Sequence, residues 1–304
     1  MIVGRRRLLH AALATTTIGF CMPAAPAARS TCSTAPPKPV ARGVQTYTAW
    51  RDIARDPKRS ITSLASLGID EIELHALVND SHWNEGEDAG YPFGGRMAEA
   101  VAAIRTWGVK VPSALLEEQR PHEPQLLLAK SLGAQYVVVI DWPELETDQL
   151  DKALVRATAR RWNDLGGLCH RFGLQLCYHN HWSDFRDING ARAFDILAKE
   201  VNPDLVMFEL DLGWLHIANV DIPQLLYDLR GRVPLIHVKD CSADSSSATP
   251  HFVALGDGVI DYGALIPLAR QFGVKHVFQE TDNPSDPFDT IKRGIAWMNK
   301  RPWI

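Results

Sequence analysis

The sequence lacks the features that mark redox, nucleic-acid-binding and dinucleotide-binding proteins. Its five Cys form no C-x-x-C pair and no zinc-finger spacing, so we expect neither a redox role nor a zinc finger. Positive charge is not in excess, because 32 Lys and Arg stand against 36 Asp and Glu, for a formal net charge of −4. An acidic chain repels phosphate backbones, which argues against nucleic-acid partners. No Gly-rich turn follows the first expected strand, VQTYTAW, which argues against a dinucleotide site.

The first 27 residues have the order of parts expected of an export signal. Arg5, Arg6 and Arg7 precede an uncharged stretch, and Ala25-Pro26-Ala27 follows as an A-x-A cleavage signal. The run RRRLLH resembles the twin-arginine form, and the apolar stretch is shorter than the roughly 20 residues of a membrane span. We therefore expect a periplasmic protein with no stable membrane association after cleavage. Removal of residues 1–27, which hold three Arg and no acid, changes the net charge from −4 to −7.

A Gly followed by a short apolar run recurs along the rest of the chain. It occurs in SLGIDEIEL, TWGVKVPSAL, SLGAQYVVVI, RFGLQLCYH and QFGVKHVFQE, with variants in VNPDLVMFEL and LRGRVPLIHV. Gly suits the left-handed position that ends a helix, so each junction indicates a helix followed by a strand. With ARGVQTYT as the first strand there are eight strands, the number that closes a (β/α)8 TIM barrel. We expect a Pro-rich leader at 28–39 and a single barrel domain at 40–304.

Amphipathic patterns predict helices between these strands. Four are marked most clearly, at residues 60–67, 97–107, 150–172 and 261–272. The connections at 76–95 and 240–258 are long and rich in Gly, Ser, Asp and aromatic residues. Both follow strands, so we expect both to lie over the face that holds the active site of a barrel.

Four side chains that can bind a metal ion stand at the carboxyl ends of apolar runs. The runs LQLCYH, DLVMFELD, VPLIH and KHVFQE end at or near His179, Asp211, His237 and Glu280. Each residue alone has an ordinary explanation as a buried histidine or a helix cap, but the ends of all barrel strands meet at one face. The sequence therefore predicts one divalent metal ion, with Mn²⁺ as the first candidate and Zn²⁺, Co²⁺, Fe²⁺ or Mg²⁺ as alternatives.

The motifs YHNHWSDF, FELDLGW, LIHVKD, LGDGVIDY and FQETDNPSDPFDTIKRGI, in this order, resemble those of the xylose isomerase-like TIM barrels. The resemblance covers nearly all of residues 40–298. It implies a sugar phosphate isomerase/epimerase type of protein, in a superfamily that also contains abasic-site endonucleases. It also implies that His179, Asp211, His237 and Glu280 bind one divalent metal.

The chain departs from this family at three positions. Many members have Glu in place of His179, and in them two metal-bound Glu residues exchange protons on opposite faces of the substrate. The epimerase His and Arg that bind substrate oxygens are replaced by Trp214 and Ala243. Glu280 is then the one obvious base, which puts a two-base epimerisation in doubt.

The resemblance and the residues together predict an exported, metal-dependent sugar isomerase/epimerase that enolises a carbohydrate carbonyl. An alternative is a 3-keto-glycoside lyase or hydrolase that acts by β-elimination at the same site. A non-catalytic exported sugar-binding protein is a third possibility, and the acidic charge disfavours an endonuclease. No basic loop or Gly-rich cradle indicates a phosphorylated substrate.

Several other residues are predicted to build the pocket for a small carbohydrate. Glu280, His179 and Lys239 are the candidate catalytic residues; Lys239 would either stabilise an enolate oxygen or form an ion pair at the rim. The substrate-binding candidates are Gln45, Glu73, His181 and Trp214. Asp141 is either a pocket residue or a helix cap. We expect about two of Trp83, Trp142, Trp182 and Trp214 to contact a sugar, and Cys169 and Cys177 to be buried without a disulfide.

Overall fold

The computed structural model describes residues 40–77, 96–117, 122–140, 142 and 150–301. The expected signal peptide and leader, most of the 76–95 connection, Trp83 and Asp141 lie outside these residues. Within the described ranges no helix is both long enough and apolar enough to span a bilayer. Residues 37–304 make up one compact unit.

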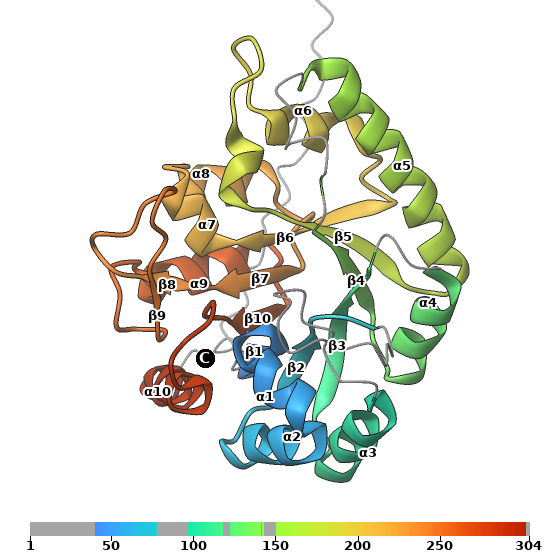
Figure 1. Ribbon diagram of the computed structural model, residues 1–304. Helices are drawn as coiled ribbons and strands as arrows, with labels where there is room; N and C mark the ends of the chain where they lie inside the picture. The colour runs from blue at the N-terminus through green and yellow to red at the C-terminus, as the bar shows by residue number, and fades with distance from the viewer. Residues whose placement is uncertain (1–39, 78–95, 118–121, 141, 143–149, 302–304) are drawn as a thin grey trace, which may run out of the picture. The chain divides into compact units, whose positions relative to one another are not determined.

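Eight parallel strands close into a barrel in the order β1-β10-β7-β6-β5-β4-β3-β2 (Figure 1). They are β1 (Gly43–Gln45), β2 (Glu71–Leu74), β3 (Lys110–Leu115), β4 (Tyr136–Val139), β5 (Gln175–His179), β6 (Val206–Asp211), β7 (Leu235–Val238) and β10 (His276–Gln279). Except where β1 meets β10, each strand pairs with its predecessor in the chain. The predicted (β/α)8 TIM barrel is therefore confirmed.

Helices surround the barrel. In chain order they are η1 (Thr46–Ala49), α1 (Trp50–Arg55), α2 (Pro57–Ser66), α3 (Met97–Trp107), α4 (His122–Ser131), α5 (Lys152–Arg171), η3 (Trp182–Phe185), α6 (Ala193–Glu200), α7 (Leu212–Ile217), α8 (Ile222–Asp228), α9 (Tyr262–Gln271) and α10 (Pro287–Asn299). The four helices predicted most clearly correspond to α2, α3, α5 and α9, with ends that differ by no more than a few residues.

The junction glycines have the predicted role. Gly108 follows α3 with φ of 65° and ψ of 22°, a left-handed conformation that residues with a Cβ adopt at a cost. The glycines at the other four junctions, Gly68, Gly133, Gly173 and Gly273, also have positive φ. Each glycine ends one helix and turns the chain into the next strand, which brings the carboxyl ends of the strands to the same face.

Two separate sets of apolar side chains fill the fold. The larger lies between the strands and the helices. The smaller fills the barrel and contains Leu115, Tyr136, Val138, Cys177, Leu235 and Phe278. Toward the carboxyl ends of the strands this interior filling gives way to His and acidic side chains, which form the candidate site.

The connection at 240–258 contains a two-stranded hairpin that the sequence did not predict. Its strands are β8 (Asp240–Cys241) and β9 (Phe252–Val253), which pair antiparallel. The carboxylate of Asp240 accepts backbone hydrogen bonds from Gly256, Gly258 and Ile260 at 2.9, 3.1 and 3.2 Å. These bonds fix the connection and hold Phe252 against Trp214, with ring centroids 4.8 Å apart.

Candidate functional site

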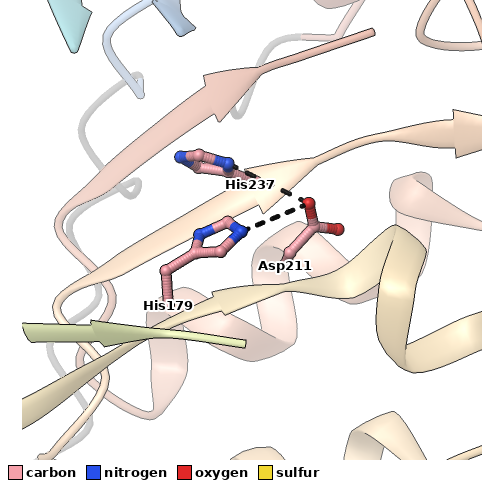
Figure 2. A group of neighbouring side chains, drawn as sticks. All are labelled: His179, Asp211 and His237. Atoms are coloured by element: carbon pink, nitrogen blue, oxygen red, sulfur yellow. Dashed lines mark ion pairs between the residues drawn. The ribbon is translucent and has the colours of Figure 1, made fainter. Parts of the chain in front are cut away.

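The four residues predicted to bind a metal meet at one end of the barrel. His179 is the last residue of β5, Asp211 is the last of β6, His237 lies in β7, and Glu280 directly follows β10. Figure 2 shows the rings of His179 and His237 directed toward the carboxylate of Asp211. The parallel register places Asp211 beside His237, so strand pairing brings these residues together.

The atoms that face one another form a compact set of possible ligands. Nε2 of His179 lies 3.9 Å from Oδ2 of Asp211, and Nδ1 of His237 lies 4.0 Å from the same oxygen. Nδ1 of His237 is also 2.8 Å from Oε2 of Glu280. The ligand atoms of His179, Asp211 and His237 all lie within 4.8 Å of one another.

The donor set of this cluster fits a divalent cation. Oδ1 of Asp211 accepts a hydrogen bond from the backbone N–H of Trp214 and caps α7, whereas the buried Oδ2 faces the two imidazoles and Nζ of Lys239. A buried carboxylate oxygen requires compensating positive charge, and Lys239 supplies one such charge. Two imidazole nitrogens and two carboxylates suit a borderline divalent metal.

Lys239 contributes a second positive group to the same place. Its Nζ lies 3.2 Å from Oδ2 of Asp211, 3.2 Å from Oε2 of Glu280 and 2.9 Å from Oδ1 of Asp282. The ammonium also lies 5.2 Å from the ring centroid of Trp214 and 5.1 Å from that of Phe252. Lys239 is only 2% exposed. The predicted ion pair of Lys239 therefore forms, but it lies inside the buried site and not at the rim.

A deeper layer of acidic side chains lies behind the two imidazoles. Oε2 of Glu209 is 3.0 Å from Nδ1 of His179 and 3.3 Å from Nε2 of His237. Oε1 of Glu73 is 2.7 Å from Nε2 of His237. Sequence reasoning missed Glu209, although it precedes Asp211 by two residues and alternate residues of a strand share a face. The same rule would have found Asp282, two residues beyond Glu280.

The environment shifts the pKa values of the two site carboxylates in opposite directions. Burial raises the pKa of Glu280, but the charges of Lys239 and His237 outweigh it and hold that pKa well below its usual range. Burial raises the pKa of Asp211 and prevails over the same two cations. Glu280 therefore stays ionised in the folded protein more readily than Asp211 does.

The imidazole and ammonium groups are shifted as well. Burial opposes charge on Lys239 and on His237, but the nearby carboxylates prevail and raise both pKa values well above their usual range. Burial lowers the pKa of His179. The pKa values of His75 and His181 fall to about 4, chiefly through burial, so both of these imidazoles are neutral at pH 7.

A cavity of about 360 Å³ opens onto this cluster. Its wall includes Gln45, His181 and Trp214, three of the four predicted substrate-binding residues, and also His75, which sequence reasoning missed. The fourth, Glu73, is fully buried and is not part of the wall; its carboxylate contacts His237 instead. The sequence placed Glu73 correctly on an inward face but could not give its depth.

The tryptophans differ from the expectation that sugar-stacking residues follow several strand ends. Trp142 is 5% exposed and packs against Trp162 and Tyr178 in the core, so it has no face for a sugar. Trp182 is 43% exposed and does not line the cavity. Among the described tryptophans, Trp214 alone lines the cavity. The cysteines Cys169 and Cys177 are buried and unbridged, as predicted.

The barrel and the cluster of His and carboxylate side chains define the class of the protein, a (β/α)8 barrel with a candidate metal site at the carboxyl ends of its strands. The profile of the xylose isomerase-like TIM barrel family matches residues 123–301. The chain belongs to this family, whose members include epimerases, isomerases and dehydratases.

Two curated relatives are inosose dehydratases. The one from Halalkalibacterium halodurans is 27% identical over 113 residues, which are 33% of this chain and 37% of the relative. The one from Geobacillus kaustophilus is 23% identical over 176 residues, or 49% of this chain and 56% of the relative. The matched segments thus span between about a third and about half of these relatives.

Solved structures with the same fold come from several bacteria. A sugar phosphate isomerase/epimerase from Parabacteroides distasonis superposes with a TM-score of 0.71 at 19% identity, over 92% of this chain and 100% of that one. A 3-keto-D-glucoside 4-epimerase from E. coli gives 0.61 at 16% identity, over 86% and 100%. A xylose isomerase-like TIM barrel protein from Mycobacterium smegmatis, in complex with magnesium, gives 0.60 at 18%, over 86% and 96%.

Proposed function

We propose that this chain is a divalent-metal-dependent enzyme that enolises a ketone of a cyclic sugar or polyol and then eliminates a β-substituent. One observation carries the proposal: Lys239, Asp211 and Glu280 form a charged cluster beside two imidazoles, at the end of a cavity of about 360 Å³. The inosose dehydratases among its relatives and the 3-keto-D-glucoside 4-epimerase among similar structures support a keto-sugar or keto-polyol substrate.

The metal would be held by His179, Asp211, His237 and Glu280. When bound, a divalent ion of this kind polarises a carbonyl oxygen and makes the neighbouring C–H bond more acidic. The convergence of the ligand atoms of His179, Asp211 and His237 within 4.8 Å supports this assignment, as does the structure of similar fold that was solved in complex with magnesium.

The chain's own side chains supply the proton transfers. Glu280 stays ionised and would take the proton from the carbon next to the carbonyl. The ammonium of Lys239, next to Glu280, would stabilise negative charge on the carbonyl oxygen as it develops. The C–O bond at the β-carbon then breaks with its electron pair, and the departing oxygen receives a proton. The proton that Glu280 took would pass to this oxygen, and the N–H groups of His75 and His181, which line the cavity, would hydrogen-bond it.

Elimination needs a base on one face of the substrate only. His179 stands where a second proton-transferring Glu would complete a two-base site, and its imidazole directs Nδ1 toward Glu209. This arrangement favours loss of a β-substituent over inversion at the α-carbon.

A second candidate is isomerisation or epimerisation through the same enolate. One observation favours it: two neutral imidazoles, His75 and His181, line the cavity in addition to Glu280. Either imidazole would take a proton on a face that Glu280 does not reach, and the imidazolium that forms would return it in the reverse direction.

The test uses a panel of inososes, 3-keto-glycosides and ketoses in deuterated water, with the protein loaded with Mn²⁺. Elimination predicts an unsaturated ketone, seen by ultraviolet absorption, together with release of water or the aglycone. Deuterium exchange that leads to a new epimer without release would instead support the second candidate. No exchange with any member of the panel would argue for a sugar-binding role.

A further inference from the structure

Two buried acidic side chains contact the ring nitrogens of His237 and His179 that are directed away from the candidate metal position. Glu73 and Glu209 are both fully buried. Glu73 contacts Nε2 of His237, and Glu209 contacts Nδ1 of His179. In each ring the other nitrogen is directed toward Asp211.

The orientation of the Gln45 amide is fixed by the backbone. The N–H of Tyr47 can only donate, and it lies 3.1 Å from Oε1 of Gln45. The amide therefore directs its Nε2 toward Glu73, with 2.6 Å between that nitrogen and Oε1 of Glu73. Because an amide nitrogen is a donor only, Oε1 of Glu73 must accept.

The same oxygen determines where His237 carries its proton. Nε2 of His237 lies 2.7 Å from Oε1 of Glu73, and two acceptors at that distance would repel each other. Nε2 therefore carries a hydrogen. Nδ1 of His237 lies 2.8 Å from Oε2 of Glu280, so without a metal ion it carries a hydrogen as well. A divalent ion would displace that hydrogen, and Nδ1 would then present a lone pair toward Asp211 and Glu280 while Nε2 keeps its hydrogen.

Glu209 supports His179 in the same way. Its Oε2 accepts from the N–H at Nε2 of His237 at 3.3 Å and lies 3.0 Å from Nδ1 of His179. With the hydrogen of His179 on Nδ1, its Nε2 is left free toward Asp211.

We propose that Gln45, Glu73 and Glu209 are positioning residues that fix His237 as its Nε2–H tautomer and His179 as its Nδ1–H tautomer, so that both present a lone pair to a divalent ion. The series of hydrogen bonds begins at the backbone N–H of Tyr47, passes through the Gln45 amide and the Glu73 carboxylate, and ends at Nε2 of His237, the nitrogen opposite the one that faces the metal position. Carboxylates that contact metal-binding histidines in this way typically contribute about 10–100-fold to metal affinity. This inference rests on the metal site of the proposed function, but not on the reaction.

The barrel contains a matched control for the test. Glu71 lies two residues before Glu73 on the same strand, is buried, and contacts Nδ1 of His276 at 2.9 Å. His276 is at the amino end of β10, away from the candidate site. A role limited to holding a histidine ring in place would make Glu71 and Glu73 equivalent, although His276 is partly exposed, with 15% of its side chain accessible.

The experiment measures Co²⁺ affinity by competition with a chelating dye in the full-length protein and in Glu73→Ala, Glu73→Gln and Glu71→Ala. We expect Glu73→Ala to lose about 10–100-fold in affinity, Glu71→Ala to bind like the wild type, and Glu73→Gln to recover most of the loss because its amide oxygen still accepts. Equal affinities of Glu73→Ala and the wild type would overturn the inference and leave the metal site standing. Absence of Co²⁺ binding by the wild type would remove both.

A second measurement does not depend on any variant folding. Long-range ¹H–¹⁵N NMR spectra of Zn²⁺-loaded protein with labelled histidine report which ring nitrogen carries the hydrogen. We expect N–H at Nε2 of His237 and at Nδ1 of His179. The opposite tautomer of His237 would refute the proposal. So would a second bound ion that Glu73→Ala abolishes, since the deep carboxylates would then be ligands.

Discussion

Nζ of Lys239 lies 3.2 Å from Oε2 of Glu280, and the two side chains are only 3% and 7% exposed. The same ammonium is 3.2 Å from Asp211. The two carboxylates that would bind a metal ion thus already share a fixed cation that the chain provides. Lys239 therefore keeps Glu280 ionised. The same ion pairs stabilise the fold at the carboxyl end of the barrel and prepare the carboxylate for its proposed role as a base.

Replacing Lys239 with Met should destabilise the fold at neutral pH. The change leaves Asp211 and Glu280 buried without their ammonium, and loss of one partner of a buried ion pair typically costs about 3–5 kcal/mol. Urea unfolding at pH 7 with a chelator present measures the free energy. Lys275→Met is the control, because Lys275 contacts the hydroxyl of Tyr136 and its loss should cost only about 1 kcal/mol. Equal losses in the two variants would contradict the role assigned to Lys239.

Asp211→Asn should abolish measurable metal binding while the barrel stays folded. Asn retains a side-chain oxygen that can accept from the N–H of Trp214, so the cap of α7 survives. The anionic ligand is lost. Metal analysis after dialysis against Mn²⁺, together with circular dichroism, separates these effects. A full complement of metal in a folded Asp211→Asn protein would remove Asp211 from the ligand set.

Glu280→Gln should reduce exchange of the substrate α-hydrogen by about 10²–10⁴-fold, because a neutral amide cannot accept the proton. Asp282→Asn is the matched comparison: Asp282 also pairs with Lys239 and lines the cavity, but it is not assigned as the base. NMR in deuterated water measures both rates, with metal content determined in the same samples. A greater loss in Asp282→Asn would transfer the role of base to that residue.

Stability should fall as the pH rises from about 4 to about 7, through Asp184. Burial raises the pKa of its carboxyl to about 7 although Tyr178 donates a hydrogen bond to it. In the unfolded chain the pKa of an Asp carboxyl is about 3.9. Between about pH 3.9 and about pH 7 the folded protein therefore binds a proton that the unfolded chain has released, and the free energy of unfolding falls as the pH rises through this range. We expect a loss on the order of 3 kcal/mol between pH 5 and pH 8, absent in Asp184→Asn. Chemical unfolding of both proteins across this range checks it; parallel profiles would be inconsistent with a raised pKa.

We propose export by the twin-arginine route. Replacing both Arg5 and Arg6 with Lys should retain the precursor in the cytoplasm, because this route reads the arginine pair. Cell fractionation with an antibody to the barrel measures it, and Arg7→Lys alone is the control. Normal export of the double variant would assign the signal to Arg7 or to another route.

Local signals in the sequence were enough to predict the barrel architecture and the site residues nearest the carboxyl ends of the strands. Gly108 and the glycines at the other junctions each mark a helix end followed by an apolar run, and both signals are local. Because a parallel barrel gathers the carboxyl ends of its strands at one face, the positions of His179, Asp211 and His237 in their runs were enough to predict that they meet. The i, i+2 alternation of a strand added Lys239 and His181.

The tertiary structure alone decided depth, partners and proton positions. Gln45 and Glu73 are partners in the register of β1 and β2, yet only Gln45 reaches the cavity wall, because the carboxylate of Glu73 contacts Nε2 of His237 in the barrel interior. Glu209 gains its role from His179 on β5 and His237 on β7, and Asp282 gains its role from Lys239, directly after β7. These partners are remote in sequence. Asp211 and Glu280 both lie 3.2 Å from Lys239, and their pKa values separate because their distances to Nδ1 of His237, 4.0 and 2.8 Å, and their degrees of burial differ. These are three-dimensional quantities that no spacing along the chain encodes.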